Sequence, residues 1–324
     1  LGLKSVAILP EGMSAERFTW LEEWVSDKND IIKTTGTESN VKEIYDACNE
    51  LKKDPNNDII NQFDEYYNYA ILRAVTGPSF EKSFLEVKGN SNLKARFYVS
   101  ASGSSGTLAA GDYLKDHLSL KIAVVEATEC PTLLNNGYGE HNIQGIGDKH
   151  VPLIHNVMNT DFVVGISDQA TNNLNMIFNT EIGQRYLTAK KGFDVELINR
   201  LPEFGFSTIA NILASIKLAK YMNLGKDDAI ITVATDGADL YLSELEKTKR
   251  EFKGIYDESM CAEIYGQYLK GVSTDHTLEL NQKEKERIFN LGYYTWVEQQ
   301  GIDINDFEKR RDQAFWNKHY NHML

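Results

Sequence analysis

The stretch FYVSASGSSGTLAAGDY, residues 97–113, decides how the rest of this sequence is organised. Its first three residues are aromatic or β-branched and predict a short buried strand, and Leu108 to His117 have helical spacing. Only small residues lie between them. A strand, a tight turn and a helix form a cradle for phosphate, because the first helical N–H groups lack intrahelical partners and carry the positive end of the helix dipole. We therefore predict an anion-binding turn made of Gly103, Ser104, Ser105, Gly106 and Thr107.

This turn differs from several common phosphate and nucleophile motifs. No lysine follows Gly106, so the turn is not a nucleoside-triphosphate loop. It lacks the G-x-G-x-x-G pattern of dinucleotide sites, and Ser105 is not framed as the G-x-S-x-G of a hydrolase. From the loop alone, a corner without any ligand stays open, as does an unrelated α/β protein that binds a nucleotide or a sugar phosphate.

Composition excludes several classes of protein. The chain has 324 residues, enough for two domains, and a formal net charge of −13, which argues against nucleic acid or an anionic membrane surface as a partner. No apolar run approaches the ~18 residues of a membrane helix. Cys48, Cys130 and Cys261 are far apart, which favours a reducing cytoplasm over a disulfide framework or a metal site. We expect a cytoplasmic protein.

Strand and helix patterns alternate along most of the chain. This alternation predicts an α/β fold with a mostly parallel sheet, in which ligands bind at the carboxyl ends of the strands. We expect a helix after Ser14 that carries Phe18, Leu21 and Trp24 on one face. After about Glu244 the strand patterns stop. Strands are predicted at residues 5–9, 31–34, 59–63, 97–99, 121–126, 161–166 and 229–233, and helices include residues 69–75 and 80–85 and those that begin at 168, 181 and 207.

Residues 246–324 predict a helical C-terminal extension. Aromatic side chains are dense between residues 293 and 316. Aromatic residues spaced along helices usually belong to a packed interior. The extension is therefore expected to pack on the body of the protein or on a second subunit.

Seven stretches resemble the cysteine synthase family. They occur in the family's order between residue 1 and about residue 245. Together they make the chain similar to the fold-type II pyridoxal-phosphate enzymes of the cysteine synthase and cystathionine β-synthase group. The stretches are PEGMSAER (10–17) for P-E-x-M-S-x-E-R, Gln62-Phe63 for Q-F, Thr76-Gly77-Pro78 for T-G-P, GSSGT (103–107) for G-T-G-G-T, HNIQGIG (141–147) for H-K-I-Q-G-I-G, Gly205-Phe206-Ser207 for G-I-S, and Tyr241-Leu242-Ser243 for Y-L-S.

The resemblance implies both an architecture and a chemistry. The fold would have two domains with mostly parallel twisted sheets, like the tryptophan synthase β subunit. Residues 1–68 would be part of a small mobile domain, residues 69–245 the large cofactor-binding domain, and 246–324 the extension. The enzyme, expected to be a homodimer, would use pyridoxal 5'-phosphate, with its phosphate in the predicted turn. It would perform β-elimination or β-replacement on a small amino acid of the cysteine, serine or O-activated serine type.

The resemblance also implies roles for single residues. Ser207 would place a neutral hydroxyl beside the pyridine nitrogen of the cofactor. Alternatively, Ser207 would be the N-cap of a helix. Gln62 and Gly145 would lie near the substrate carboxylate or the cofactor face, and Gln62 could equally be an ordinary polar residue. His141 is expected to be a hydrogen-bonded loop residue. Asp236 could face the cofactor ring or cap the next turn.

Two family features are missing from the expected place. The lysine that forms a Schiff base with the cofactor, and the T-S-G-N loop for the substrate carboxylate, both precede the P-E-x-M-S segment, which begins here at Pro10. We expect that lysine upstream of Leu1, since Lys4 has the position of an ordinary strand residue. A non-catalytic relative of the fold is the alternative.

Overall fold

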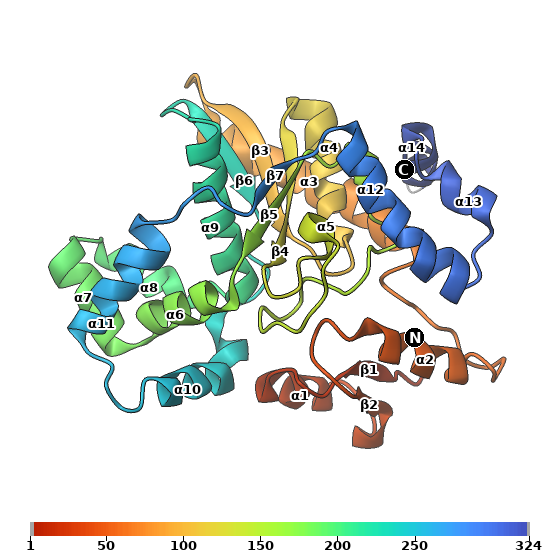
Figure 1. Cartoon of the computed structure of the whole chain (residues 1–324), viewed down its shortest axis with the longest axis horizontal. Helices are drawn as coiled ribbons and strands as arrows, with labels where there is room; N and C mark the ends of the chain where they lie inside the picture. Colours follow the sequence, from red (N-terminus) through yellow and green to blue (C-terminus); the bar gives the residue numbers. More distant parts are fainter. Residues whose placement is uncertain (1–2, 323–324) are drawn as a thin grey trace.

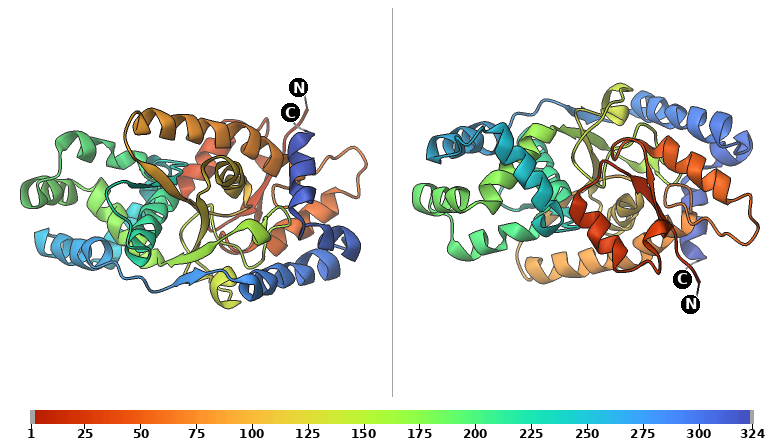
Figure 2. Two further views of the ribbon diagram at one scale, coloured as in Figure 1. Left: turned by 90° about the horizontal axis from the view of Figure 1, so that it is seen from above. Right: turned by 90° about the horizontal axis from the view of Figure 1, so that it is seen from below.

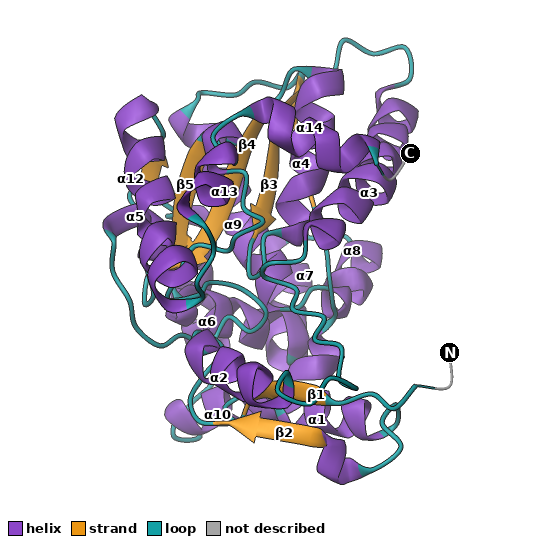
Figure 3. Ribbon diagram, turned by 90° about the vertical axis from the view of Figure 1, so that its right-hand side faces the viewer, coloured by secondary structure: helices purple, strands orange, loops and turns teal. Residues whose placement is uncertain are grey.

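Two separate sheets organise the chain, as Figure 1 shows. The computed structural model describes residues 3–322. The smaller sheet pairs β1 (Ala7–Pro10) with β2 (Ile31–Thr34) in parallel, and α1 (Ala15–Glu22) and α2 (Val41–Leu51) accompany it. We call residues 3–62 the N-terminal lobe and the rest the main body. Figure 3 shows the two-stranded sheet of this lobe lying apart from the five-stranded sheet of the body.

The five-stranded sheet has the strand order β6-β3-β4-β5-β7. The strands β6, β3, β4 and β5 are parallel to one another, which confirms the predicted α/β class. β7 is antiparallel to β5 at the sheet edge, so the prediction that strands end near Glu244 is wrong. Three residues are too few to give a strand pattern in the sequence. The strands are β3 (Lys94–Ala101), β4 (Lys121–Ala127), β5 (Phe162–Ile166), β6 (Asp228–Thr232) and β7 (Thr277–Glu279).

Helices cover both faces of this sheet and create two cores. Successive residues of β3 alternate between them, with Phe97 and Val99 in one core and Tyr98 in the other. α6 (Asp168–Asn179) and α9 (Phe206–Tyr221) cover the first face. α3 (Tyr66–Lys88) and α4 (Gly106–Leu118) cover the second, together with α12 (Gln282–Tyr293) and α13 (Ile304–Lys309). The remaining helices are α5 (Thr132–Asn135), α7 (Glu181–Lys191), α8 (Val195–Arg200), α10 (Leu242–Glu251), α11 (Glu258–Ile264) and α14 (Gln313–Asn321).

Three local predictions are wrong. Residues 59–63 form an irregular loop and turn instead of a strand, and neither of the two sheets includes them. The two expected helices at 69–75 and 80–85 are one helix, α3, which continues through Pro78. Trp24 follows the end of α1 and is 69% exposed, with its ring tilted against Trp20.

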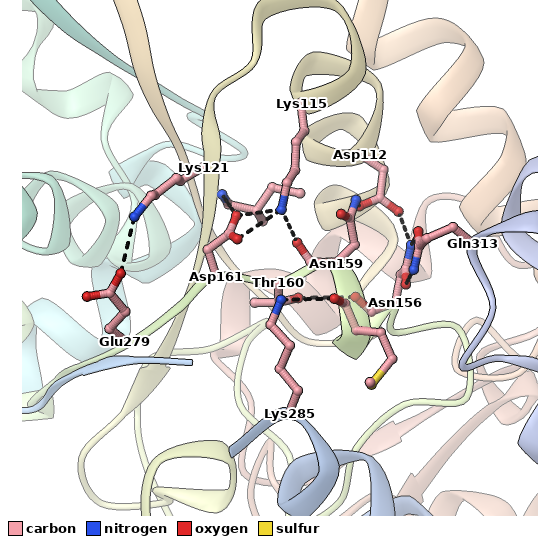
Figure 4. A network of polar contacts seen from close by, with 12 residues as sticks. Asp112, Lys115, Lys121, Asn156, Asn159, Thr160, Asp161, Glu279, Lys285 and Gln313 are labelled. Carbon is pink, nitrogen blue, oxygen red and sulfur yellow. Dashed lines mark hydrogen bonds and ion pairs between the residues drawn. The ribbon is translucent and has the colours of Figure 1, made fainter. Parts of the chain in front are cut away.

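The C-terminal extension packs on the main body, and it is helical apart from β7. Trp296 and Trp316 are fully buried, and their indole N–H groups donate to the carbonyls of Val151 and Arg310, at 2.7 and 2.8 Å. Figure 4 shows Asn156 linking Asp112 on α4 to Gln313 on α14. In Figure 2 the extension's last helices and helices α6–α8 lie at opposite ends of the molecule. No helix among residues 3–322 is both long and apolar enough to cross a bilayer.

Candidate functional site

A cavity of about 450 Å³ lies between the N-terminal lobe and the main body. Pro10 and Met13 of the lobe line it, and so do Ala101 at the end of β3 and Thr235 after β6. It therefore lies at the carboxyl ends of parallel strands, where such sheets bind ligands. All the predicted site residues line this one cavity: Gln62, Gly103, Ser104, Ser105, Gly106, Thr107, Gly145 and Ser207.

The predicted anion-binding turn joins β3 to the N-terminus of α4. Ser105 has a left-handed backbone (φ 72°) and directly precedes the helix. A Cβ on Gly103 would stand 2.7 Å from the carbonyl oxygen of Gly145, and one on Gly106 would stand 2.6 Å from Leu72 Cδ1. Only glycine fits this packing without displacing a neighbour. The first residues of α4 consequently line the cavity with backbone N–H groups that no intrahelical carbonyl can accept.

Hydroxyl groups hold the turn in shape. Ser100 Oγ donates to Thr107 Oγ1 at 2.8 Å, and Ser102 Oγ donates to Ser105 Oγ at 3.2 Å. Ser104 Oγ accepts from Asn68 at 3.5 Å, which ties the turn to α3. The turn is thus a preformed cradle whose strongest contribution to an anion is its backbone amides and the helix dipole.

A pair of hydroxyls forms another part of the wall. Ser207 Oγ and Thr235 Oγ1 are 2.8 Å apart. The N-cap of α9 is Gly205, so the N-cap alternative for Ser207 is wrong. Nearby, Asn211 accepts from the Ala101 N–H at 2.6 Å and donates to the Val233 carbonyl at 3.0 Å. Sequence reasoning missed Asn211, although an asparagine among apolar residues of a helix was a signal.

Polar groups at the start of α1 bind the N-terminal lobe to the main body across the cavity. Arg17 Nη2 donates to Asp236 Oδ2 at 2.8 Å and to the Tyr241 hydroxyl at 2.6 Å. Tyr241 in turn donates to Asp236 at 2.6 Å. Ser14 N donates to Gln144 Oε1 at 3.0 Å. Asp236 thus pairs with Arg17 in the cavity wall, and these contacts hold the lobe over the cavity.

Glu38 and Asp148 were also missed by the sequence reasoning. Both line the cavity, Glu38 from the N-terminal lobe and Asp148 from the main body. Burial raises the pKa of Glu38 above its ordinary value, against the opposing effect of Arg17. Burial raises the pKa of Asp148 well above its ordinary value, and the charge of Glu38 adds to this rise. The sequence feature that could have pointed to Asp148 is its place directly after the glycine-rich run at 141–147.

The remaining predicted residues have simpler environments. Gln62 is exposed at the cavity wall. Gly145 has a left-handed backbone (φ 85°). His141 is a buried loop residue whose Nε2 lies 2.6 Å from the Gly147 carbonyl oxygen, as expected. Within residues 3–322 none of the lining residues is a lysine, and Lys4 pairs instead with Asp30 at 2.8 Å.

This donor set fits pyridoxal 5'-phosphate. The glycine turn supplies amides for a phosphate, because the space that a Cβ would fill is left to the backbone. The Ser207–Thr235 pair offers a neutral hydroxyl at the cavity wall, which would suit a ring nitrogen. Several polar atoms of the cavity lining are buried and have no hydrogen-bond partner within the described part of the chain. They include Arg17 Nε, Gln144 Nε2 and Asp236 Oδ1. Such atoms call for a polar ligand. No group of three or more potential metal ligands occurs among the described residues.

Solved structures share this fold. A hydrogen sulfide-producing enzyme from Fusobacterium nucleatum is 23% identical, with a TM-score of 0.58 over 81% of this chain and 70% of that one. An O-acetylserine dependent cystathionine β-synthase from Helicobacter pylori is 24% identical, with a TM-score of 0.55 over 74% of this chain and 69% of that one. These likenesses support a cysteine synthase-like fold for the main body and lobe together.

Curated relatives identify the family. No protein-family model matches the chain. A cysteine synthase from a Flavobacterium strain is 27% identical over 168 residues, which are 51% of this chain and 51% of that protein. Cysteine synthase B from Campylobacter jejuni is 30% identical over 246 residues, which are 75% of this chain and 71% of that protein. The chain therefore belongs to the cysteine synthase family.

Proposed function

We propose that this protein is a pyridoxal 5'-phosphate-dependent enzyme that performs β-elimination or β-replacement on a small amino acid of the serine or cysteine type. The observation that carries the proposal is the glycine turn at 103–107, which meets Ser207, Gln62 and Gly145 in one cavity. The bound cofactor would supply the electron sink that lets an amino acid lose its α-proton and β-substituent.

The chain's own residues position and shield the reactants in this proposal. The amides at the start of α4 bind the phosphate, and the hydroxyl of Ser207, oriented by Thr235, meets the ring nitrogen. A hydroxyl does not force protonation of that nitrogen as a carboxylate would, so the electron sink stays moderate and suits β-elimination. Gln62 and Gly145 line the substrate side.

The N-terminal lobe excludes water from the site in this proposal. Residues 1–68 act as part of a small mobile domain and residues 69–245 as the large cofactor-binding domain. The Arg17–Asp236 ion pair and the Ser14–Gln144 hydrogen bond would hold the closed state. Closure of this kind strengthens electrostatic interactions inside an active site. We further propose that the protein works in the cytoplasm as a homodimer.

Cofactor titration tests the proposal directly. Purified protein is titrated with pyridoxal 5'-phosphate while its near-ultraviolet and visible absorbance is recorded, and then supplied with cysteine or O-acetylserine. We expect saturable cofactor binding, followed by release of sulfide or acetate. Absence of binding to protein that is folded by circular dichroism would refute the proposal.

One observation favours a second candidate, a non-catalytic relative that binds the cofactor or a similar phosphate without turnover. None of the residues lining the cavity within residues 3–322 is a lysine. Saturable binding together with an absorbance spectrum of free pyridoxal phosphate, and no release of sulfide or acetate, would identify this case.

A further inference from the structure

Two carboxylates from opposite sides of the cavity have no partner for their inner oxygens. Glu38 lies in the loop between β2 and α2, and Asp148 follows the loop at 141–147. Among residues 3–322, Glu38 Oε2 and Asp148 Oδ2 are each shielded from solvent and lack a hydrogen-bond partner. Asp148 is 7% exposed, and both side chains line the cavity. An unpaired buried carboxylate is costly, so a pair of them in a cavity wall calls for a ligand.

The cations nearby are already engaged. The Nη2 of Arg17 donates to Asp236 and Tyr241, and Lys149 Nζ donates to Asn40 at 3.2 Å. His150 is neutral, since burial lowers its pKa to about 3, and its Nε2 lies 2.8 Å from the Tyr45 hydroxyl.

The cavity therefore presents groups of both polarities. The turn at 103–107 offers amides to an anion, whereas three carboxylates, those of Glu38, Asp148 and Asp236, line the wall together with one guanidinium, that of Arg17. A metal ion is disfavoured, because no group of three potential ligands occurs among the described residues. An ammonium group fits better, because its three N–H donors can bond to both free carboxylate oxygens.

We propose that Glu38 and Asp148 form a subsite for the ammonium group of a second, amine-bearing ligand that enters the cavity beside the phosphate cradle. This step rests on the proposed function in one respect only: if the protein performs β-replacement, the incoming nucleophile is an ammonium-bearing thiol. The hydrosulfide anion would be repelled by the same two carboxylates.

Binding at this subsite has a proton signature. In the free protein burial raises the pKa of both carboxyl groups, and the charge of Glu38 raises the pKa of Asp148 as well, so the unliganded cavity favours a protonated carboxyl group here. An arriving ammonium group stabilises both carboxylates, and the displaced proton leaves to solvent. One ligand binds and up to one proton is released.

Calorimetry with a charge series of thiols tests this subsite without any added cofactor. The probes are 2-aminoethanethiol, 2-mercaptoethanol and 3-mercaptopropionate, which are cationic, neutral and anionic, each titrated under reducing conditions at pH 7 in buffers of different ionisation enthalpy. We expect the cationic thiol to bind at least tenfold more tightly than the neutral one, with release of close to one proton.

Matched variants decide which side chains are responsible. Asp148→Asn and Glu38→Gln keep the shape of each side chain and should each reduce the tenfold preference and the proton release. Asp239→Asn changes an exposed carboxylate outside the cavity wall and should leave both unchanged. Equal binding of the three thiols, a preference that survives both variants, or displacement of the cationic thiol by Mg²⁺ would overturn the proposal.

The outcome is separable from that of the proposed function. Cofactor binding with no charge preference would refute the ammonium subsite and leave the proposed function intact. A preference for the cationic thiol without cofactor binding would refute the proposed function and leave the ammonium subsite intact.

Discussion

Ser207 Oγ lies 2.8 Å from Thr235 Oγ1, and this short contact joins the first turn of α9 to the loop after β6 at the cavity wall. Either hydroxyl can be the donor, so the pair can present a donor or a free lone pair to a ligand. Because Thr235 fixes the position of Ser207, the neutral hydroxyl is held in place before any ligand arrives.

Replacing Ser207 should weaken cofactor binding modestly and change its spectrum. Ser207→Ala removes one hydrogen bond, worth about 1 kcal/mol or roughly a fivefold loss of affinity. Ser207→Asp should instead favour a protonated ring nitrogen and shift the absorbance maximum of the bound cofactor. Titration followed by absorbance measures both effects, and a variant with unaltered affinity and spectrum would place the ring nitrogen elsewhere.

The cradle should not tolerate a methyl group at Gly103. In Gly103→Ala the new Cβ would stand 2.7 Å from the backbone carbonyl oxygen of Gly145, so the turn or the loop that faces it must shift. We expect a loss of at least tenfold in affinity for pyridoxal 5'-phosphate, which is about 1.4 kcal/mol. Gly266→Ala is the matched control, because a Cβ added there would have no neighbouring atom within 4 Å. Equal affinities of the two variants would contradict the cradle.

The Arg17–Asp236 pair should hold the N-terminal lobe closed. Arg17→Met leaves the carboxylate of Asp236, whose side chain is 16% exposed, without its cation. The expected loss of unfolding free energy is about 2–4 kcal/mol, since a carboxylate that is mostly buried becomes unpaired. The double variant Arg17→Met, Asp236→Asn should recover part of that loss, because it removes the stranded charge as well. Urea denaturation of the parent, Arg17→Met, Asp236→Asn and the double variant measures the coupling, and strictly additive effects would show that the pair contributes nothing.

Asp148 should make the protein less stable as pH rises. Its pKa is raised in the folded state by burial and by Glu38, so its favourable contribution is complete below its ordinary value of 3.8 and is lost as pH rises through the raised value. Asp148→Asn removes this dependence. At pH 8 the variant should therefore be more stable than the parent by roughly 1–3 kcal/mol, and the difference should vanish near pH 4. Unfolding followed by circular dichroism from pH 4 to pH 8 compares the two proteins. A difference in unfolding free energy that does not change with pH would show that Glu38 and burial do not raise the pKa of Asp148.

The sequence predicted the cavity better than it predicted its electrostatics. The glycine turn could be found because its small residues stand between a strand pattern and a helix pattern, which is a local physical reason. Ser207 and Gly145 could be found through the resemblance of G-F-S and H-N-I-Q-G-I-G to short family motifs. Arg17, Glu38 and Asp148 act through contacts between segments more than a hundred residues apart, and no local pattern reveals which charge meets which. Their proximity depends on how the N-terminal lobe lies against the main body.

The errors in the predicted secondary structure have the same origin, which is contact between distant segments. The loop at 59–63 has β-forming residues at its ends, but a strand needs a paired neighbour, and these residues belong to neither sheet of the described chain. α3 continues through Pro78 because packing against α4 outweighs the single hydrogen bond that proline removes. β7 becomes a strand only because the edge of β5 is open to it.

The most direct test is a crystal structure of this chain with pyridoxal 5'-phosphate. We predict that the phosphorus lies against the turn at 103–107, with its oxygens within hydrogen-bonding distance of the amides of Gly106 and Thr107, and that the ring nitrogen faces Ser207. Density for the phosphate at any other place on the molecule would contradict the account.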